Sequence, residues 1–312
     1  MSFCSAKFFY EFYEPLQGDK NGSIGTVSPK NLLSCIHDSR RTDAFQGAQE
    51  DAQEFLSFIL DVMHEEFATH QEFLNWEFSE STMKLMQVDD EAQEDGWLEV
   101  GKGRKVSETR TMRTTETPIS FLFSGQFKSR VKRSGSKDSI TFEPFNCLQL
   151  EVHHRHISSI EDSLAYLSRA ELIQPGLTKF LTINTLPMIL IIQLKRFVYN
   201  IEASRIEKVM KYIEYPERLV IGKNVCSSFN VESGQPTYRL FSVVYHHGRQ
   251  AGGGHYTADV RKSFKQDDPW MRINDISIAK VSLDQVLQDR HNDRTAYLLF
   301  YQRAKDVKSS VV

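Results

Sequence analysis

His255 is the residue of this sequence best placed for proton transfer, because three glycines precede it and the strand-like run "HYTADV" begins with it. Glycines carry no side chain, so a substrate backbone could pass close to the imidazole. A histidine held on a rigid strand can act as a general base near neutral pH. The alternative is a histidine that only ends a strand, with the glycines forming a turn. For an isolated "GGGH" this alternative is favoured, so the hypothesis needs support from elsewhere in the chain.

Asn274 and Asp275, in "WMRIND", are the candidate partners of this histidine. A hairpin between Tyr256 and Trp270 would bring Asn274 or Asp275 beside His255. An amide or carboxylate that accepts a hydrogen bond from one imidazole nitrogen fixes the tautomer and leaves the other nitrogen free to take a proton. The same dipeptide is common in ordinary turns, and that interpretation stays open when the pair is considered alone.

The elements that must position these residues begin with helices. Residues 47–67 form the clearest predicted helix, because apolar residues recur there at spacings of three and four. The apolar stripe consists of Ala52, Phe55, Leu56, Ile59, Met63 and Phe67. A shorter helix is predicted within 158–172, where Ser158 and Glu161 stand at capping-box spacing.

Beyond Pro118 the pattern changes to that of strands. The runs "ISFLFSGQFKSRVKR" and "ITFEPFNCLQLEV" predict a hairpin, and further strands are predicted over 187–199, 238–247, 255–263 and 295–303. Between the helices and this region, residues 80–116 are charged and aperiodic, which indicates an exposed and partly disordered insertion. Helices followed by a mainly antiparallel sheet make α+β the predicted fold class.

Composition excludes several classes of function. A net charge of -3 over 312 residues, without a long basic face, argues against a nucleic-acid partner. The longest purely apolar run, 188–192, is far too short to cross a bilayer, and no cleavage site for a secretory signal follows the first residues. The scattered cysteines indicate reduced thiols inside the cell. We therefore expect residence in the cytoplasm, with the nucleus left open, and no membrane partner.

Six blocks in order carry a resemblance to a known family. They are "GAQEDAQEFLSFIL", "LPMILIIQLKRFVYN", "YRLFSVVYHHG", "GGGHYTADV", "WMRINDISI" and "TAYLLFYQR". Together they resemble the catalytic domain of the ubiquitin-specific proteases, which are cysteine peptidases, over about residues 47–303. The resemblance implies a papain-like fold with a helical thumb and a mainly antiparallel palm and fingers. It also implies hydrolysis of the bond after the C-terminal glycine of ubiquitin, with ubiquitin and ubiquitinated proteins as partners.

The resemblance assigns roles to individual positions. His255 matches the general base, Asn274 matches the residue that orients it, and Asp275 matches a neighbouring acid that supports the site. Asp51 and Glu54 match acidic positions that bind the arginine-bearing tail of ubiquitin, for which carboxylates are the suitable partners. Tyr256 is expected to line the channel for the two terminal glycines of ubiquitin. Without the other blocks, the acidic pair would be interpreted as solvated surface charge.

The same comparison divides the chain into four parts. Residues 1–79 match a helical thumb that is incomplete at its N-terminal edge, and residues 80–116 form the acidic and polar insertion. Residues 117–303 match the β-rich fingers and palm, and residues 304–312 form a flexible tail.

One motif of the family is missing from the sequence. Family members carry a box of the form Gly-Asn-Thr-Cys-Tyr-x-Asn-Ser, whose cysteine is the nucleophile of a Cys-His-Asn mechanism. Cys4 in "MSFCSAKFF" and Cys35 in "NLLSCIHDSRR" both lack these flanking residues. A thiolate must lie within reach of the base at a site that lowers the pKa of the thiol. We therefore expect this chain to be inactive alone.

Two interpretations of the whole chain remain at this point. One is a deubiquitinase whose printed sequence lacks the nucleophile, and the other is a non-catalytic domain that binds ubiquitin or acts as a scaffold. "HHRH" at His153, His154 and His156 lacks a convincing set of further metal ligands, so a solvated strand end is favoured there. No Cys-x-x-Cys pairs occur, so neither a structural zinc nor another cofactor is expected. The oligomeric state is left open.

Overall fold

The computed structural model describes eight stretches of the chain. They are residues 51–70, 98–100, 106–111, 115–226, 235–250, 253–261, 269–288 and 294–304. The chain forms two compact units, Met1–Leu74 and Asn75–Val312, and each is described here by itself. The predicted boundary between thumb and insertion lies five residues further along, after residue 79. Cys4 and Cys35 lie outside the described residues.

The first unit contributes helix α3, Ala52–Thr69, which corresponds to the helix predicted over 47–67. It begins at Asp51, whose Oδ1 accepts hydrogen bonds from the backbone N–H groups of Gln53 at 2.8 Å and Glu54 at 3.3 Å. An aspartate at this position satisfies helix N–H groups that have no partner within the helix and interacts favourably with the helix dipole. The only fully buried residue of α3 is Leu60, which the predicted stripe did not include.

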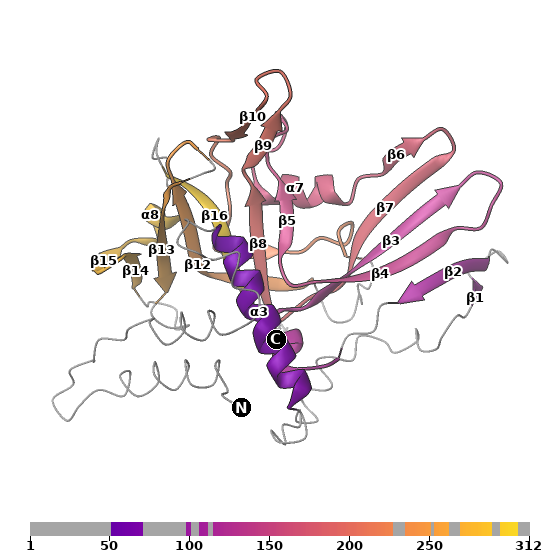
Figure 1. The fold of residues 1–312 in the computed structure, drawn as a ribbon, viewed down its shortest axis with the longest axis horizontal. Helices are drawn as coiled ribbons and strands as arrows, with labels where there is room; N and C mark the ends of the chain where they lie inside the picture. The colour runs from indigo at the N-terminus through magenta and orange to yellow at the C-terminus, as the bar shows by residue number, and fades with distance from the viewer. Residues whose placement is uncertain are drawn as a thin grey trace, which may run out of the picture. The chain divides into compact units, whose positions relative to one another are not determined.

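The second unit contains an eight-stranded sheet in the order β15-β14-β13-β12-β16-β8-β5, with β11 also paired to β12 (Figure 1). Neighbouring strands are antiparallel except β5 and β8, which are parallel. The strands are β5 Leu148–Glu151, β8 Ile189–Lys195, β11 Arg218–Val220, β12 Thr237–His247, β13 His255–Arg261, β14 Trp270–Asn274, β15 Ser277–Val281 and β16 Arg294–Arg303.

The core of this unit lies over the four adjacent strands β12, β16, β8 and β5. Its apolar side chains are fully buried, including Leu150, Ile192, Leu240 and Leu299. The nearly continuous apolar run "ILIIQL", interrupted only by the buried Gln193, suits a strand covered on both faces. The buried tyrosines of the core form hydrogen bonds through their hydroxyl groups. The hydroxyl of Tyr238, for example, donates to the Pro187 carbonyl at 2.5 Å.

A second sheet has six strands in the order β1-β2-β4-β3-β7-β6, and Figure 1 shows β3, β4 and β7 as long neighbouring ribbons. Its strands are β1 Leu98–Val100, β2 Val106–Thr111, β3 Gly125–Arg133, β4 Ser139–Phe145, β6 Glu171–Gln174 and β7 Leu177–Thr185. The predicted hairpin is present as β3 and β4, which pair antiparallel. The segment 80–116, for which partial disorder is predicted, contributes the short strands β1 and β2.

The start of the predicted hairpin is wrong, because "PISFLF" forms helix α6, Pro118–Phe123, and β3 begins only at Gly125. Thr117 and Ser120 explain the helix through a reciprocal capping box, with side-chain to backbone distances of 3.1 and 2.8 Å. Proline at the first helical position adds to this signal, since its fixed φ suits a helix start. These local signals outweigh the strand propensity of the aromatic residues that follow.

Helix α7, Ile160–Leu167, is present where a helix was predicted, but its cap lies one residue further along. Ser159 and Asp162 form the capping box, in place of Ser158 and Glu161. Ser158 still contributes, since its Oγ donates to Asp162 Oδ2 at 2.8 Å. The backbone N–H of Ser158 donates to the same oxygen at 2.8 Å, and these hydrogen bonds from Ser158 lower the pKa of Asp162.

The strand predicted over 187–199 is interrupted at Arg196, which separates β8 from β9, Phe197–Asn200. The guanidinium of Arg196 is buried and donates to the carbonyls of Ala296, Val209 and Lys211 at 2.5, 2.9 and 2.8 Å. Burial lowers the pKa of Arg196 to about 10. Strand β9 pairs with β10, Arg205–Lys208, in a separate two-stranded sheet, so the strand predicted over 187–199 is divided between two sheets.

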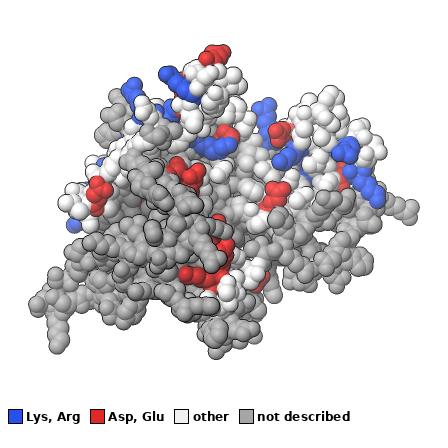
Figure 2. Space-filling view, viewed as in Figure 1, with Lys and Arg blue, Asp and Glu red and all other residues white. Residues whose placement is uncertain are grey.

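Charged side chains of both signs are interspersed over the described part of the face in Figure 2. Over the long strands of the six-stranded sheet, basic residues stack on aromatic rings, with Lys132 Nζ 5.1 Å from the ring centre of Phe180. Among the helices that the structure describes, none combines the length and the apolar composition needed to span a bilayer.

Candidate active site

His255 and Asn274 contact each other directly, with 2.6 Å between His255 Nε2 and Asn274 Oδ1. His255 is the first residue of β13 and Asn274 is the last residue of β14, and the two strands pair antiparallel. The register places Ala258 opposite Ile273, so Asn274 falls beside Thr257, two residues from His255 on the same face. The predicted juxtaposition of His255 and Asn274 is therefore present in the structure.

This contact determines which nitrogen of the neutral imidazole carries the proton. An amide oxygen only accepts hydrogen bonds, so the proton of neutral His255 resides on Nε2. The other nitrogen, Nδ1, then carries the lone pair and can accept a proton from a nucleophile. The arrangement therefore has the geometry of a base held by an orienting amide.

Asp275 occupies the two-residue turn between β14 and β15 and adopts a left-handed conformation, with φ of 49°. Aspartate tolerates this region better than most residues, because its short polar side chain can bond locally. The side chain is exposed. In the structure Asp275 thus shapes the turn that follows Asn274, and its assistance to the base stays a prediction.

Tyr256 lies on the opposite face of β13 from His255. Its ring packs edge-on against His246, with 5.0 Å between the ring centres, and lies 6.2 Å from the ring of Tyr297. These contacts hold the start of β13 on its neighbours. The predicted contact of Tyr256 with the glycines of a ubiquitin tail is not tested by them.

Glu54 lies on α3 and Asp51 directly precedes this helix, in the other compact unit. Glu54 is exposed, and Asp51 caps the helix as described above. The sequence interpretation gave Asp51 only a binding role and missed this structural one. The spacing of Asp51 just before an apolar-periodic helix could have predicted the cap.

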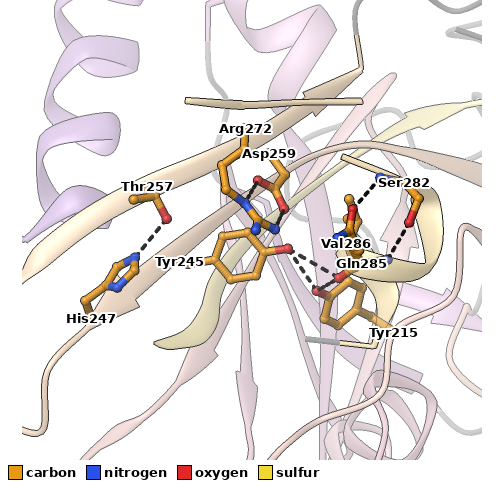
Figure 3. Close-up of polar contacts among 9 residues, drawn as sticks. All are labelled: Tyr215, Tyr245, His247, Thr257, Asp259, Arg272, Ser282, Gln285 and Val286. Atoms are coloured by element: carbon orange, nitrogen blue, oxygen red, sulfur yellow. Dashed lines mark hydrogen bonds and ion pairs between the residues drawn. The ribbon is translucent and has the colours of Figure 1, made fainter. Parts of the chain in front are cut away.

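Polar residues that the sequence interpretation missed line the same face of the sheet as His255. Figure 3 shows four of them, His247, Thr257, Asp259 and Arg272. His247 is the cross-strand partner of His255, and its Nε2 lies 2.9 Å from Thr257 Oγ1. Asp259 is completely buried and binds Arg272 through both carboxylate oxygens, at 2.8 and 2.7 Å. Alternation along β13 places His255, Thr257 and Asp259 on one face, which was a signal available in the sequence.

A tyrosine pair anchors helix α8, Leu283–Leu287 (Figure 3). Tyr215 and Tyr245 both donate to the carbonyl of Val286, at 2.6 and 3.3 Å. Ser282 and Gln285 close a capping box at the start of this helix. Since Tyr245 belongs to β12 and pairs with Thr257, the helix is tied to the strand next to His255.

The described stretches contain two cysteines, Cys147 and Cys226. Cys226 is buried, and its backbone forms an isolated β-bridge with Ile183 of β7. Cys147 lies in the short connection between β4 and β5. Within the part of the chain that the structure describes, no group of three or more histidine, cysteine or acidic residues could hold a metal ion. The ring of His154 stacks on His156, with ring centres 5.6 Å apart, and lies tilted against His153, with ring centres 3.9 Å apart.

Comparison with known proteins finds a matching family model and several relatives. The family model described as ubiquitin carboxyl-terminal hydrolase matches residues 2–301. Probable ubiquitin carboxyl-terminal hydrolase 3 of Schizosaccharomyces pombe is 35% identical over 331 residues, covering 95% of this chain and 63% of that protein. Ubiquitin carboxyl-terminal hydrolase 10 of Gallus gallus is 38% identical over 282 residues, covering 83% of this chain and 35% of that protein. The chain thus spans less than two thirds of the length of these relatives.

Solved structures show the same fold at low sequence identity. The SAGA Ubp8/Sgf11/Sus1/Sgf73 DUB module bound to ubiquitin aldehyde matches with a TM-score of 0.70 and 21% identity, covering 97% of this chain and 60% of that chain. A SAGA DUB module bound to monoubiquitin matches with the same TM-score and 22% identity, covering 97% of this chain and 59% of that chain. The predicted α+β fold of the ubiquitin-specific protease type is confirmed.

Proposed function

The chain belongs to the ubiquitin carboxyl-terminal hydrolase family, and from this premise we propose that it binds ubiquitin and supplies the base and the orienting amide for cleavage after the terminal glycine. The observation that carries the proposal is the contact of His255 Nε2 with Asn274 Oδ1 at 2.6 Å. It leaves Nδ1 as the nitrogen that accepts a proton. The substrates would be proteins conjugated to ubiquitin.

In the proposed reaction, His255 Nδ1 takes the proton of a cysteine thiol, and the thiolate attacks the carbonyl carbon of the last glycine of ubiquitin. The bond from this carbon to the amine of the conjugated protein then breaks, and the imidazolium gives its proton to the leaving amine. Water next attacks the thioester, with His255 accepting and returning a proton. The products are the ubiquitin carboxylate and the free thiol. Asn274 keeps the imidazole in the required tautomer throughout.

The nucleophile is the part of this mechanism without a motif in the sequence. No Gly-Asn-Thr-Cys box is present among the 312 residues, and Cys4 and Cys35 lack its flanking residues. We therefore predict that the chain alone does not react with a ubiquitin probe that carries a C-terminal electrophile. This absence favours a second candidate function, a non-catalytic ubiquitin-binding or scaffolding domain with the same His255 and Asn274 geometry.

The electrophilic probe tests the catalytic part of the proposal. Incubation with the purified chain, followed by mass spectrometry, is expected to give no covalent adduct. An adduct on Cys4 or Cys35 would show that the chain holds its own nucleophile and would overturn the predicted inactivity. In that case His255→Ala and Asn274→Ala should slow adduct formation, and a rate unaffected by His255→Ala would reject this residue as the base.

Titration calorimetry with ubiquitin tests the binding part. Measurable binding is expected, and its absence would reject both candidate functions. For the acidic positions, Asp51→Asn is the informative variant, because asparagine caps a helix as well as aspartate but carries no charge. We expect it to weaken ubiquitin binding while lowering thermal stability only slightly, because the cap is kept and only the interaction with the helix dipole is lost. Glu54→Gln should weaken binding in the same way, and added salt should reduce both effects.

A further inference from the structure

Lys208, the last residue of β10, holds a buried ammonium group that the proposed mechanism does not use. Only 9% of the residue is exposed. Its Nζ donates to His246 Nδ1 at 2.8 Å and to the carbonyls of His246 and Gly248 at 2.9 and 2.7 Å. An ammonium group has three N–H donors, so all three are used. Lys208 therefore fixes the point where β12 ends and the connection to β13 begins.

The charge on Lys208 is costly in this place. Burial, together with the positive charge of Arg196, lowers the pKa of Lys208 from 10.5 to about 8. The group still carries its proton at neutral pH, where it can make three directed hydrogen bonds. A lysine used only to cover apolar surface would keep its ammonium group in water. The burial of this group indicates a positional role.

His246 is the side chain that Lys208 holds, and its ring is also buried, with 2% exposure. Because Nδ1 accepts the hydrogen bond from Lys208, the ring is neutral and carries its proton on Nε2. The ring lies against Gly254, where an added Cβ would stand 2.4 Å from His246 Nε2 and 2.8 Å from Cε1. Any side chain at position 254 would collide with the imidazole, so glycine is required there for space.

The strand register relates this arrangement to His255. His246 pairs with Tyr256, and His247 pairs with His255, so the ring of His246 lies on the opposite face of the strands from His255. Lys208 thus holds the beginning of the connection between β12 and β13, and the ring that it fixes supports the end of that connection at Gly254. The next residue in the chain is His255.

We propose that Lys208 and His246 are positioning residues, which set the backbone at Gly254 so that the ring of His255 meets Asn274. The proposal rests on the proposed function, in which His255 is the base. A contact of 2.6 Å is sensitive to small displacements of either strand end. The lysine acts from β10, a strand that is not part of the eight-stranded sheet.

The test measures the tautomer of the His255 imidazole by nuclear magnetic resonance. It uses the 312-residue chain with isotope labels at the histidine nitrogens. His255→Gln assigns the signals, and Asn274→Ala defines the spectrum of a ring that has lost its partner. In Lys208→Met, the preference of His255 for the tautomer protonated at Nε2 should fall by about five- to tenfold, the range expected for losing a hydrogen bond. The signals should move toward those of Asn274→Ala.

Lys211→Met is the matched control, because Lys211 Nζ also donates to backbone carbonyls, those of His154 and Ile157, both at 2.7 Å. It should leave the signals of His255 unchanged even if it lowers stability. Should Lys208→Met fail to fold, Gly254→Ala carries the test, because it keeps Lys208 and pushes the backbone off the ring of His246. It is expected to shift the signals of His255 in the same direction.

Signals of His255 that stay as in the wild type in Lys208→Met, or in Gly254→Ala where that variant is used, would overturn the positioning role. A different failure would concern the proposed function. If Asn274→Ala leaves His255 unchanged, the pair of base and orienting amide does not exist in solution. The two outcomes are distinguishable because they come from different variants.

Discussion

Asp259 and Arg272 lie directly opposite each other on β13 and β14, and Arg272 Nε and Nη2 donate to the two carboxylate oxygens of Asp259. The pair stands four residues from His255 and two residues from Asn274. A shift of one residue between the strands would send Arg272 to the opposite face from Asp259. The bidentate ion pair therefore fixes the register that brings Asn274 Oδ1 to the imidazole.

Removing the arginine should be strongly destabilising. Arg272→Met leaves the carboxylate of Asp259, which is completely buried, without its partner, and we expect the free energy of unfolding to fall by about 3 to 5 kcal/mol. Chemical denaturation measures this change. The control is Arg205→Met, which removes an ion pair with Glu207 whose side chains are 72% and 38% exposed, and which should cost about 1 kcal/mol or less. Equal losses in the two variants would contradict the register role.

The cap of α7 gives a second test at the level of single residues. Ser159→Ala removes the side chain that accepts from the backbone N–H of Asp162 at 3.1 Å, and we expect a loss of about 1 kcal/mol in the free energy of unfolding. Ser158→Ala removes only a bond to the side chain of Asp162 and should cost less. A larger loss in Ser158→Ala than in Ser159→Ala would contradict this assignment and favour the capping box of Ser158 and Glu161 that the sequence spacing predicts.

A third prediction concerns the buried hydroxyl of Tyr238. Tyr238→Phe removes the donor to the carbonyl of Pro187, and we expect a loss of about 1 to 2 kcal/mol because a buried acceptor loses its partner. Tyr199→Phe is the matched control, since the residue is 63% exposed and water can replace its contacts. Thermal unfolding of both variants measures the difference, and indistinguishable melting temperatures would refute it.

The stacked histidines predict a pH dependence of stability. Burial and the neighbouring His153 and His156 lower the pKa of His154 below its ordinary value of 6.5. The unfolded chain therefore binds a proton at His154 more readily than the folded chain. The contribution of His154 to stability is complete above pH 6.5 and is lost as the pH falls toward the lower pKa of the folded state. His154→Gln should lose less stability than the wild type between about pH 7 and 5.

Denaturation at several pH values measures this difference. The comparison with the wild type matters because other groups also titrate, among them Glu161, whose pKa is raised by burial. Identical pH profiles for the two proteins would show that the stack does not perturb His154.

The sequence by itself determined the family, the α+β class and the juxtaposition of His255 and Asn274. Residue types in ordered blocks carry this information, and the alternation of "HYTADV" and "WMRIN" is a local property that survives without coordinates. The helix at α3 was equally predictable from its apolar spacing. Where local signals competed, as in "TPISFLF", the strand interpretation was wrong because a capping box and a proline decide the conformation.

Only the tertiary structure decided which distant residues support His255. Lys208 and His246 are 38 positions apart, and their contact depends on how the β9–β10 hairpin meets the end of β12. Arg196 and its partner Ala296 are 100 positions apart, so no local sequence pattern predicts their contact either. Periodicity shows which face a side chain occupies, whereas the neighbour it meets there depends on how strands remote in sequence pack together.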